Sequence, residues 1–159
     1  MPNSLFAARA RVQFSLEPFA KEILLIEDHP ADVRLMREAL RSFPAVPSLK
    51  VVSDGGEALR YLRREAEYAE ARRPSLIFMD LNLPKLDSRE VLRQLKADPS
   101  LRTIPVAILT SSDADRDVRE VYEMHANCYL RKPVDLDDYL GIVRETIHFW
   151  LEVAQVPGE

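Results

Sequence analysis

The sequence predicts an α/β protein, a doubly wound parallel sheet of five strands built from five strand–helix units, (βα)5. Three observations predict this class. Short apolar runs alternate with longer amphipathic segments, each apolar run ends in polar residues, and the runs lack the in-and-out alternation of half-exposed strands. Continuous apolar strands are buried on both faces, as in a parallel sheet. Strand–helix–strand units with right-handed crossovers then place helices on both sides.

Five apolar runs are the expected strands, and each is followed by a segment with a helix signal. Pro30 suits the first turn of a helix, because its missing N–H would have no partner there. Asp54 and Glu57 have the spacing of a capping box and predict a helix that runs to about Ala71. The same pattern begins at Asp87. The expected strands are 23–26, 49–52, 76–79, 106–109 and 128–130.

The last helix is expected to be long, from 136 to 155. Such a helix would span about 30 Å at about 1.5 Å per residue. A five-residue strand spans only about 17 Å, so the helix outruns the sheet. Its overhanging apolar end predicts a two-fold homodimer through this helix and tail, and the alternative is that the tail folds back over its own core. The apolar positions follow a heptad-like spacing: Leu136, Leu140, Val143, Ile147, Trp150 and Ala154.

Composition excludes several classes of protein. The 22 basic and 26 acidic residues give a net charge of −4, which lacks the basic footprint of a nucleic-acid-binding protein. No apolar run approaches the roughly 18 residues of a membrane span, and no secretory signal is visible. Cys128 is the single cysteine, so an intramolecular disulfide is impossible. We therefore expect a soluble, cytoplasmic domain that binds neither nucleic acid nor membrane.

Polar residues that carry chemistry gather at the ends of the expected strands. Glu27 and Asp28 follow the first strand, Asp80 the third, Thr110 the fourth and Lys132 the fifth. Ligands of doubly wound sheets bind at this edge. Clustered carboxylates repel one another, and a hard divalent cation such as Mg²⁺ relieves that repulsion. A carboxylate can also act as a nucleophile that forms an aspartyl phosphate, so this edge suits phosphoryl chemistry.

Four motifs, in this order and spacing, resemble the receiver domain of two-component response regulators. The resemblance covers about 21–148 and implies the flavodoxin-like strand order 2-1-3-4-5. It divides the chain into an N-terminal arm (1–20), a receiver domain (21–148) and an extension of the last helix with a tail (149–159). The motifs are Ile-Leu-Leu-Ile-Glu-Asp at 23–28, Phe-Met-Asp-Leu-Asn-Leu-Pro at 78–84, Leu-Thr-Ser at 109–111 and Tyr-Leu-Arg-Lys-Pro at 129–133.

The resemblance implies a metal-dependent phosphoacceptor site. Asp80 matches the residue that is phosphorylated in this family. Glu27 and Asp28 match its acidic pair, with Asp28 as a direct metal ligand. Asn82 would give its backbone carbonyl to Mg²⁺, for which Mn²⁺ can substitute. One departure lies in the following loop, where the family often has Met-Asp-Gly and this chain has Leu86-Asp87-Ser88.

The resemblance also implies a switch. Thr110 and Lys132 match the switch hydroxyl and the lysine of the family, and Tyr129 occupies the aromatic switch position. Pro133 matches a proline whose preceding peptide bond is usually cis, so we expect a cis Lys132–Pro133 bond.

The function implied is that of a stand-alone response regulator receiver. A histidine kinase would transfer a phosphoryl group to Asp80, and the surface of the fourth helix, fifth strand and fifth helix would then change. Such a protein is not a turnover enzyme, apart from phosphotransfer and slow self-dephosphorylation. The insert 61–74, the segment 81–85 and the tail 149–152 resemble regulators that partner bacterial phytochrome histidine kinases. A bacteriophytochrome kinase is therefore the expected partner.

Other functions use similar residues. A haloacid-dehalogenase-like phosphatase needs a second Asp two residues after its nucleophile, and Asn82 cannot serve as an acid there. A flavin-binding variant of the sheet would need a phosphate-cradling loop, which the sequence lacks. A receiver-like module that binds without phosphorylation is the remaining alternative. The output also stays open, since the protein could bind an effector, pass the phosphoryl group to a phosphotransfer protein, or drain its kinase.

Overall fold

The computed structural model describes residues 21–158, so the expected arm at 1–20 lies outside them. The chain forms one parallel sheet in the order β2-β1-β3-β4-β5, which confirms the predicted fold class and strand order. The strands are β1 (Glu22–Ile26), β2 (Ser48–Val52), β3 (Leu76–Met79), β4 (Val106–Thr110) and β5 (Cys128–Arg131).

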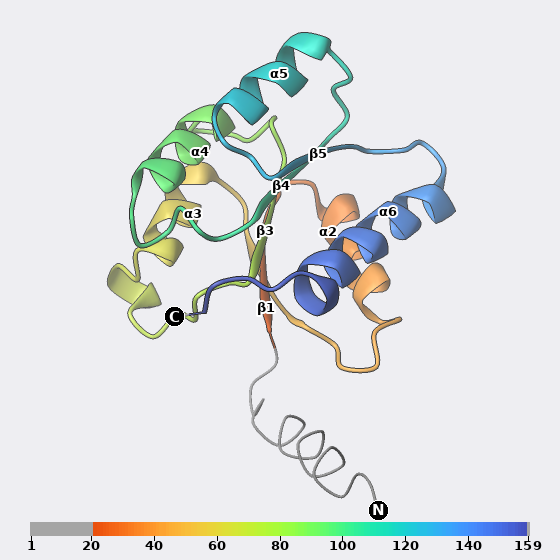
Figure 1. Ribbon diagram of the computed structural model, residues 1–159, viewed down its shortest axis with the longest axis horizontal. Coiled ribbons are helices and arrows are strands. Elements are labelled where there is room, and N and C mark those ends of the chain that lie inside the picture. Colours follow the sequence, from red (N-terminus) through yellow and green to blue (C-terminus); the bar gives the residue numbers. More distant parts are fainter. Residues whose placement is uncertain (1–20, 159) are drawn as a thin grey trace, which may run out of the picture.

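Helices cover both faces of the sheet. Figure 1 shows α2 and α6 together on one face and α3, α4 and α5 on the other. The α6 helix continues into a π-helical turn, Phe149–Val153, and a short 3-10 turn, Ala66–Tyr68, follows α3. The helices are α2 (Pro30–Leu40), α3 (Gly55–Leu62), α4 (Ser88–Ala97), α5 (Asp115–Glu123) and α6 (Leu136–His148). None of the helices in the described range is long and apolar enough to cross a membrane.

Each face of the sheet has its own apolar core, because successive strand residues point to opposite sides. Ile23 and Leu25 of β1 pack with α2 and α6, whereas Leu24 and Ile26 pack with the three helices of the other face. Every residue of β1, β3 and β4 is buried. This explains the continuous apolar runs of the sequence and leaves only the strand ends for polar chemistry.

The helix starts largely follow the sequence signals. Pro30 occupies the first turn of α2. The Asp54 carboxylate accepts a hydrogen bond from the Glu57 backbone N–H at 2.9 Å and caps α3. Asp87 caps α4 by accepting from the Arg89 N–H at 2.8 Å, one residue earlier than the capping-box pattern implies.

The predicted end at Ala71 of the helix that begins after Asp54 is wrong, because this helix, α3, ends at Leu62. Arg64 and Ala66 have left-handed φ angles of 57° and 51°, a conformation that stops a right-handed helix. The segment after α3 then packs against the helix through an aromatic contact. The Tyr61 and Tyr68 rings meet edge to face at 5.2 Å, and the Lys50 ammonium lies over both.

The last helix is shorter than the predicted range 136–155, and most of its apolar seam faces its own sheet. Leu140, Val143 and Ile147 are buried in the core of the α2–α6 face, and Leu151, within the π-helical turn, joins them. The helical conformation ends at Val153, and the chain beyond it runs past the end of the sheet where β1 begins (Figure 1). The Lys21 ammonium donates to the Leu151 carbonyl and ties this turn to the start of β1.

A core substitution in α6 tests this packing. Ile147 is fully buried, so we expect Ile147→Ala to lower the free energy of unfolding by about 2–5 kcal/mol in urea titrations. Val153 is 62% exposed, and Val153→Ala should change it by less than about 0.5 kcal/mol. Equal effects of the two substitutions would contradict the placement of the helix.

Candidate functional site

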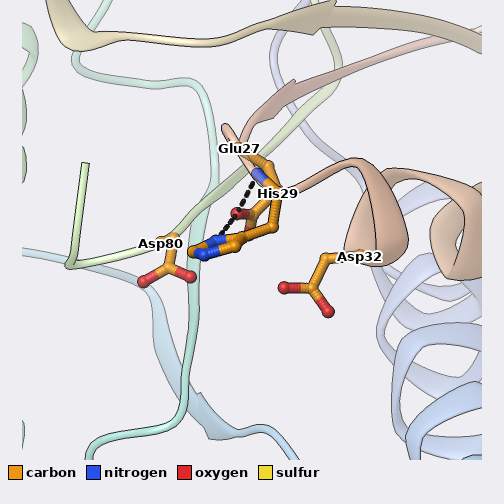
Figure 2. Close-up of side chains that lie close together, drawn as sticks. All are labelled: Glu27, His29, Asp32 and Asp80. Carbon is orange, nitrogen blue, oxygen red and sulfur yellow. Dashed lines mark hydrogen bonds and ion pairs between the residues drawn. The ribbon is translucent and has the colours of Figure 1, made fainter. Parts of the chain in front are cut away.

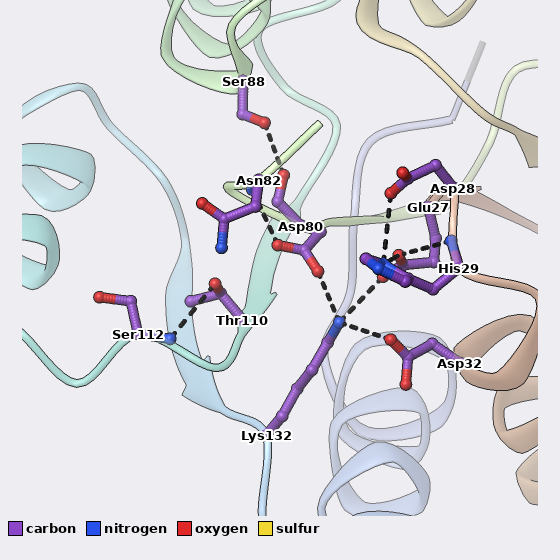
Figure 3. Close-up of polar contacts among 10 residues, drawn as sticks. All are labelled: Glu27, Asp28, His29, Asp32, Asp80, Asn82, Ser88, Thr110, Ser112 and Lys132. Carbon is purple, nitrogen blue, oxygen red and sulfur yellow. Dashed lines mark hydrogen bonds and ion pairs between the residues drawn. The ribbon is translucent and has the colours of Figure 1, made fainter. Parts of the chain in front are cut away.

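The polar residues at the strand ends meet at one edge of the sheet, as predicted. Parallel strands present their carboxyl ends on the same side, so the residues that follow β1, β3 and β5 become neighbours. The Lys132 ammonium lies between three carboxylates (Figure 3). Its Nζ atom is 2.5 Å from Asp80 Oδ2, 3.0 Å from Glu27 Oε2 and 3.0 Å from Asp32 Oδ2.

This ammonium group has all its donors in use. Lysine carries three N–H groups, and each meets a different carboxylate. Burial lowers the pKa of Lys132, but the hydrogen bonds that its ammonium donates to Asp80, Glu27 and Asp32 outweigh burial and raise the pKa above its usual value. The lysine is therefore a fixed positive charge in a site where its side chain is only 9% exposed.

Asp80 is a buried carboxylate held in its ionised form. Its Oδ1 accepts the Asn82 backbone N–H at 2.9 Å, and its Oδ2 accepts from Lys132. Burial acts to raise the pKa of Asp80, but these two hydrogen bonds prevail and lower it. Burial raises the pKa of the neighbouring Glu27 despite its bonds to Lys132 and the His29 N–H. The two neighbouring carboxyls therefore have opposite pKa shifts, and the contacts of Asp80 favour its ionised form.

A group of potential metal ligands adjoins this lysine. One ligand atom from each of Glu27, His29, Asp32 and Asp80 lies within 4.8 Å of all the others (Figure 2). Carboxylate oxygens at this spacing fit a hard divalent cation. Asp28 is not in this group. Its carboxylate is 3.4 Å from His29 Nδ1, and its side chain is about one-third exposed.

Of the four metal ligands expected from the sequence, two lie together in this group and two do not. The structure brings Glu27 and Asp80 together. The roles of Asp28 and of the Asn82 carbonyl as metal ligands stay predictions, since Asn82 contacts Asp80 through its N–H.

Two residues of the site were missed by the sequence reasoning. Ser88 is fully buried, and its hydroxyl donates to the backbone carbonyl of Asp80 at 2.6 Å. Its sequence signal is the departure from the glycine that the family often has at this position. Asp32 binds Lys132 across the site. Its only sequence signal was an acidic residue in a first helical turn, which is a common feature of helices.

The two residues expected to form a switch, Thr110 and Tyr129, both contact Ser112. Thr110 is fully buried, and its hydroxyl oxygen accepts the Ser112 backbone N–H at 3.5 Å. The Tyr129 hydroxyl donates to the Ser112 carbonyl at 2.7 Å. The Ser112 hydroxyl in turn donates to Asp117 of α5 at 2.5 Å. The hydroxyl, the aromatic ring and the helix of the expected switch are thus joined through one loop residue.

The expectation of a cis bond before Pro133 is not borne out. No cis peptide bond occurs between residues 21 and 158, so the Lys132–Pro133 bond is trans. The trans form of a bond to proline is favoured by about 0.5–1 kcal/mol when nothing else selects the isomer. Lys132 reaches its three carboxylates with this trans bond in place.

Comparison with known proteins identifies the class. Residues 23–144 match the response regulator receiver domain, and the chain therefore belongs to this family. It is 44% identical over 138 residues to the response regulator Rcp1 of Synechocystis sp., a match that covers 87% of this chain and 94% of Rcp1. The receiver thus accounts for nearly the whole length of that relative.

Two solved structures are similar over most of the chain. The first is the phosphorylated cyanobacterial phytochrome response regulator RcpA, with a TM-score of 0.85, 46% identity, and coverage of 88% of this chain and 100% of RcpA. The second is the Mn²⁺-bound form of Rcp1, with a TM-score of 0.82, 44% identity, and coverage of 87% and 99%. The family assignment excludes the phosphatase and flavin-binding alternatives.

The Ser88 contact predicts a stability effect. We expect Ser88→Ala to lower the free energy of unfolding by about 1–3 kcal/mol, because it leaves the buried Asp80 carbonyl without its donor. Urea unfolding without metal measures this. Ser42→Ala is the control, since the Ser42 hydroxyl makes a similar bond to the Ala39 carbonyl at an exposed site where water can replace it. Equal losses in the two variants would contradict a special role for Ser88.

Proposed function

We propose that this receiver accepts a phosphoryl group from a histidine kinase on Asp80 in a Mg²⁺-dependent reaction. The observation that carries the proposal is the buried Asp80 carboxylate, held ionised between the Asn82 N–H and the Lys132 ammonium. The receiver family supplies the reaction class. The Mn²⁺ bound by the related Rcp1 supports a divalent cation at this edge.

In the proposed transfer, a carboxylate oxygen of Asp80 attacks the phosphorus of a kinase phosphohistidine. A new O–P bond forms as the P–N bond breaks, and the imidazole keeps the bonding electrons. Lys132 donates to a phosphoryl oxygen and holds it in place. Glu27, Asp28, Asp80 and the Asn82 carbonyl would hold Mg²⁺, which neutralises phosphoryl charge when bound. Slow attack of water on the phosphorus would later release phosphate and restore the carboxylate.

The proposed output is a change of the surface formed by α5, β5 and α6. Thr110 would turn its hydroxyl toward the new phosphoryl oxygens and release the Ser112 N–H. Tyr129, bound to the Ser112 carbonyl, would then change position with this loop. Asp117 would carry the change into α5, because it accepts the Ser112 hydroxyl.

The proposed kinase is a bacteriophytochrome. Relatives at similar length are described as phytochrome or bacteriophytochrome response regulators, and they include RcpA and RtBRR. A downstream phosphotransfer protein, an effector or a phosphate sink are the possible outputs. A receiver that binds partners without phosphorylation is the alternative, and labelling at Asp80 separates the two.

Replacement of the acceptor tests the reaction. Asp80→Asn should abolish labelling by acetyl phosphate or by the kinase, because an amide is not a nucleophile, and excess EDTA should stop labelling of the wild type. Autoradiography after gel separation measures this. Asp98→Asn removes a carboxylate of the opposite edge, near Ser100, and should be labelled normally. Labelling of Asp80→Asn at the wild-type rate would refute the assignment.

We also propose that the end of α6 forms a homodimer. Phe149 is 48% and Val153 is 62% exposed, and the Trp150 ring packs edge to face on Phe149 at 5.0 Å. Leu136 at the start of the helix is also exposed. Buried Leu140, Val143 and Ile147 serve the fold instead, so the proposed contact is confined to the outer face and the turn.

Exposed residues of this turn test the dimer without disturbing the core. Phe149→Ser combined with Val153→Ser should convert a dimeric wild type into monomers at micromolar concentration, as measured by sedimentation velocity. Val46→Ser removes a similarly exposed apolar side chain from the segment between α2 and β2 and should leave the dimer intact. A monomeric wild type, or a double variant that stays dimeric, would refute this interface.

A further inference from the structure

Asp32, in the first turn of α2, is the third carboxylate on Lys132 and lies outside the four sequence motifs. We propose that Asp32 is a positioning residue: it holds the Lys132 ammonium before transfer, and it is the partner that Lys132 releases when a phosphoryl oxygen takes one of its N–H groups. This inference rests on the proposed phosphoryl acceptance at Asp80.

The need for an exchange follows from the number of donors. Lys132 has three N–H groups, which meet Asp80 at 2.5 Å, Glu27 at 3.0 Å and Asp32 at 3.0 Å. Asp80 has two oxygens, and in this proposal one forms the bond to phosphorus while the other keeps its contact with Lys132. A phosphoryl oxygen that is to accept from the same ammonium must then displace Glu27 or Asp32. The surroundings of each carboxylate before transfer thus decide which one loses its hydrogen bond from Lys132.

Burial selects Asp32 as the residue that gives way. The Glu27 side chain is 3% exposed, so a Glu27 oxygen that lost the Lys132 donor would stay without a water partner. The Asp32 side chain is 25% exposed and can be hydrated after release. It also lies in the first turn of α2, where the helix N-terminus stabilises a negative charge (Figure 3).

Charge gives the direction of the effect. Lys132 faces three carboxylates, and Asp32 is the one that contacts neither of the backbone donors, Asn82 and His29, that serve Asp80 and Glu27. Its negative charge opposes an arriving phosphoryl dianion and competes with that dianion for the ammonium. Asp32 therefore slows phosphoryl acceptance and shortens the life of the phosphorylated form.

Acetyl phosphate is a suitable probe, because it removes the kinase from the experiment. An Asp80 oxygen attacks its phosphorus, the bond from phosphorus to the acetyl oxygen breaks, and acetate leaves with the bonding electrons. The rate of labelling at saturating Mg²⁺ gives kcat/KM, and the decay of labelled protein after removal of the donor gives its lifetime.

We expect Asp32→Asn to raise kcat/KM for acetyl phosphate roughly threefold to tenfold, the effect of one screened charge on a nearby dianion, and to lengthen the lifetime similarly. Asp32→Glu restores the charge and should bring both values back toward the wild type. Glu38→Gln is the matched control, because it removes one carboxylate from the same helix at an exposed position paired with Arg41, and it should change neither value.

A measurement without phosphodonor separates this role from metal binding. Calorimetric titration with Mg²⁺ should show that Asp32→Asn weakens binding less than Asp28→Asn does. An unchanged or reduced kcat/KM in Asp32→Asn would overturn the inference, as would a loss of Mg²⁺ affinity equal to that of Asp28→Asn. A wild type that acetyl phosphate and the kinase both fail to label would overturn the proposed function itself, whereas a labelled wild type with an unaltered Asp32→Asn overturns the inference alone.

Discussion

The contact between the Lys132 ammonium and its three carboxylates depends on the relative positions of four elements, which are β1, β3, β5 and α2. Lys132 follows β5, Asp80 follows β3, Glu27 follows β1, and Asp32 lies in the first turn of α2. Each Lys132 bond joins segments at least 52 residues apart in the sequence. An ammonium placed away from this meeting point would leave buried carboxylates without a counter-charge, which is strongly unfavourable.

The sheet makes this arrangement possible because its strands are covered on both faces. The apolar side chains of β1, β3 and β4 are all buried, so the position of each strand is set by two cores and not by the charges. The charged residues then lie at a rigid edge. A buried ion pair adds little stability by itself, but a stable scaffold can hold such a group in a geometry that suits chemistry. The apolar cores therefore hold the charged site in place, and the charged site adds little to the stability of the fold.

Most of the sheet and the main chemical residues could be predicted from the sequence, because both follow local rules. A buried parallel strand is a continuous apolar run, and the residue after the run lies at the carboxyl edge, which placed Glu27, Asp80 and Lys132 correctly. The end of α3 could not be predicted, since it depends on left-handed φ angles at Arg64 and Ala66 that the residue types do not favour.

The remaining differences concern contacts between distant segments. Ser88 and Asp32 act through partners that only the folded chain brings near, and neither residue type is unusual at a helix start. The spacing of Leu140, Val143 and Ile147 fits a helix seam equally well whether the seam meets a second chain or its own sheet. In the structure these three residues pack against the sheet, because α6 lies beside α2 on the face that they cover.

The first turn of α4 joins Asp80, the proposed acceptor, to the proposed output surface. Ser88 holds the backbone of Asp80, and the next residue, Arg89, bonds Asp117 and Glu120 of α5 at 2.7 Å each. Asp117 also accepts the Ser112 hydroxyl, and the Ser112 carbonyl accepts the Tyr129 hydroxyl. A change at Asp80 can therefore reach α5 by two short routes, one through the start of α4 and one through the loop after β4. Because both routes end on Asp117, the position of α5 depends on the acceptor strand and the switch loop together.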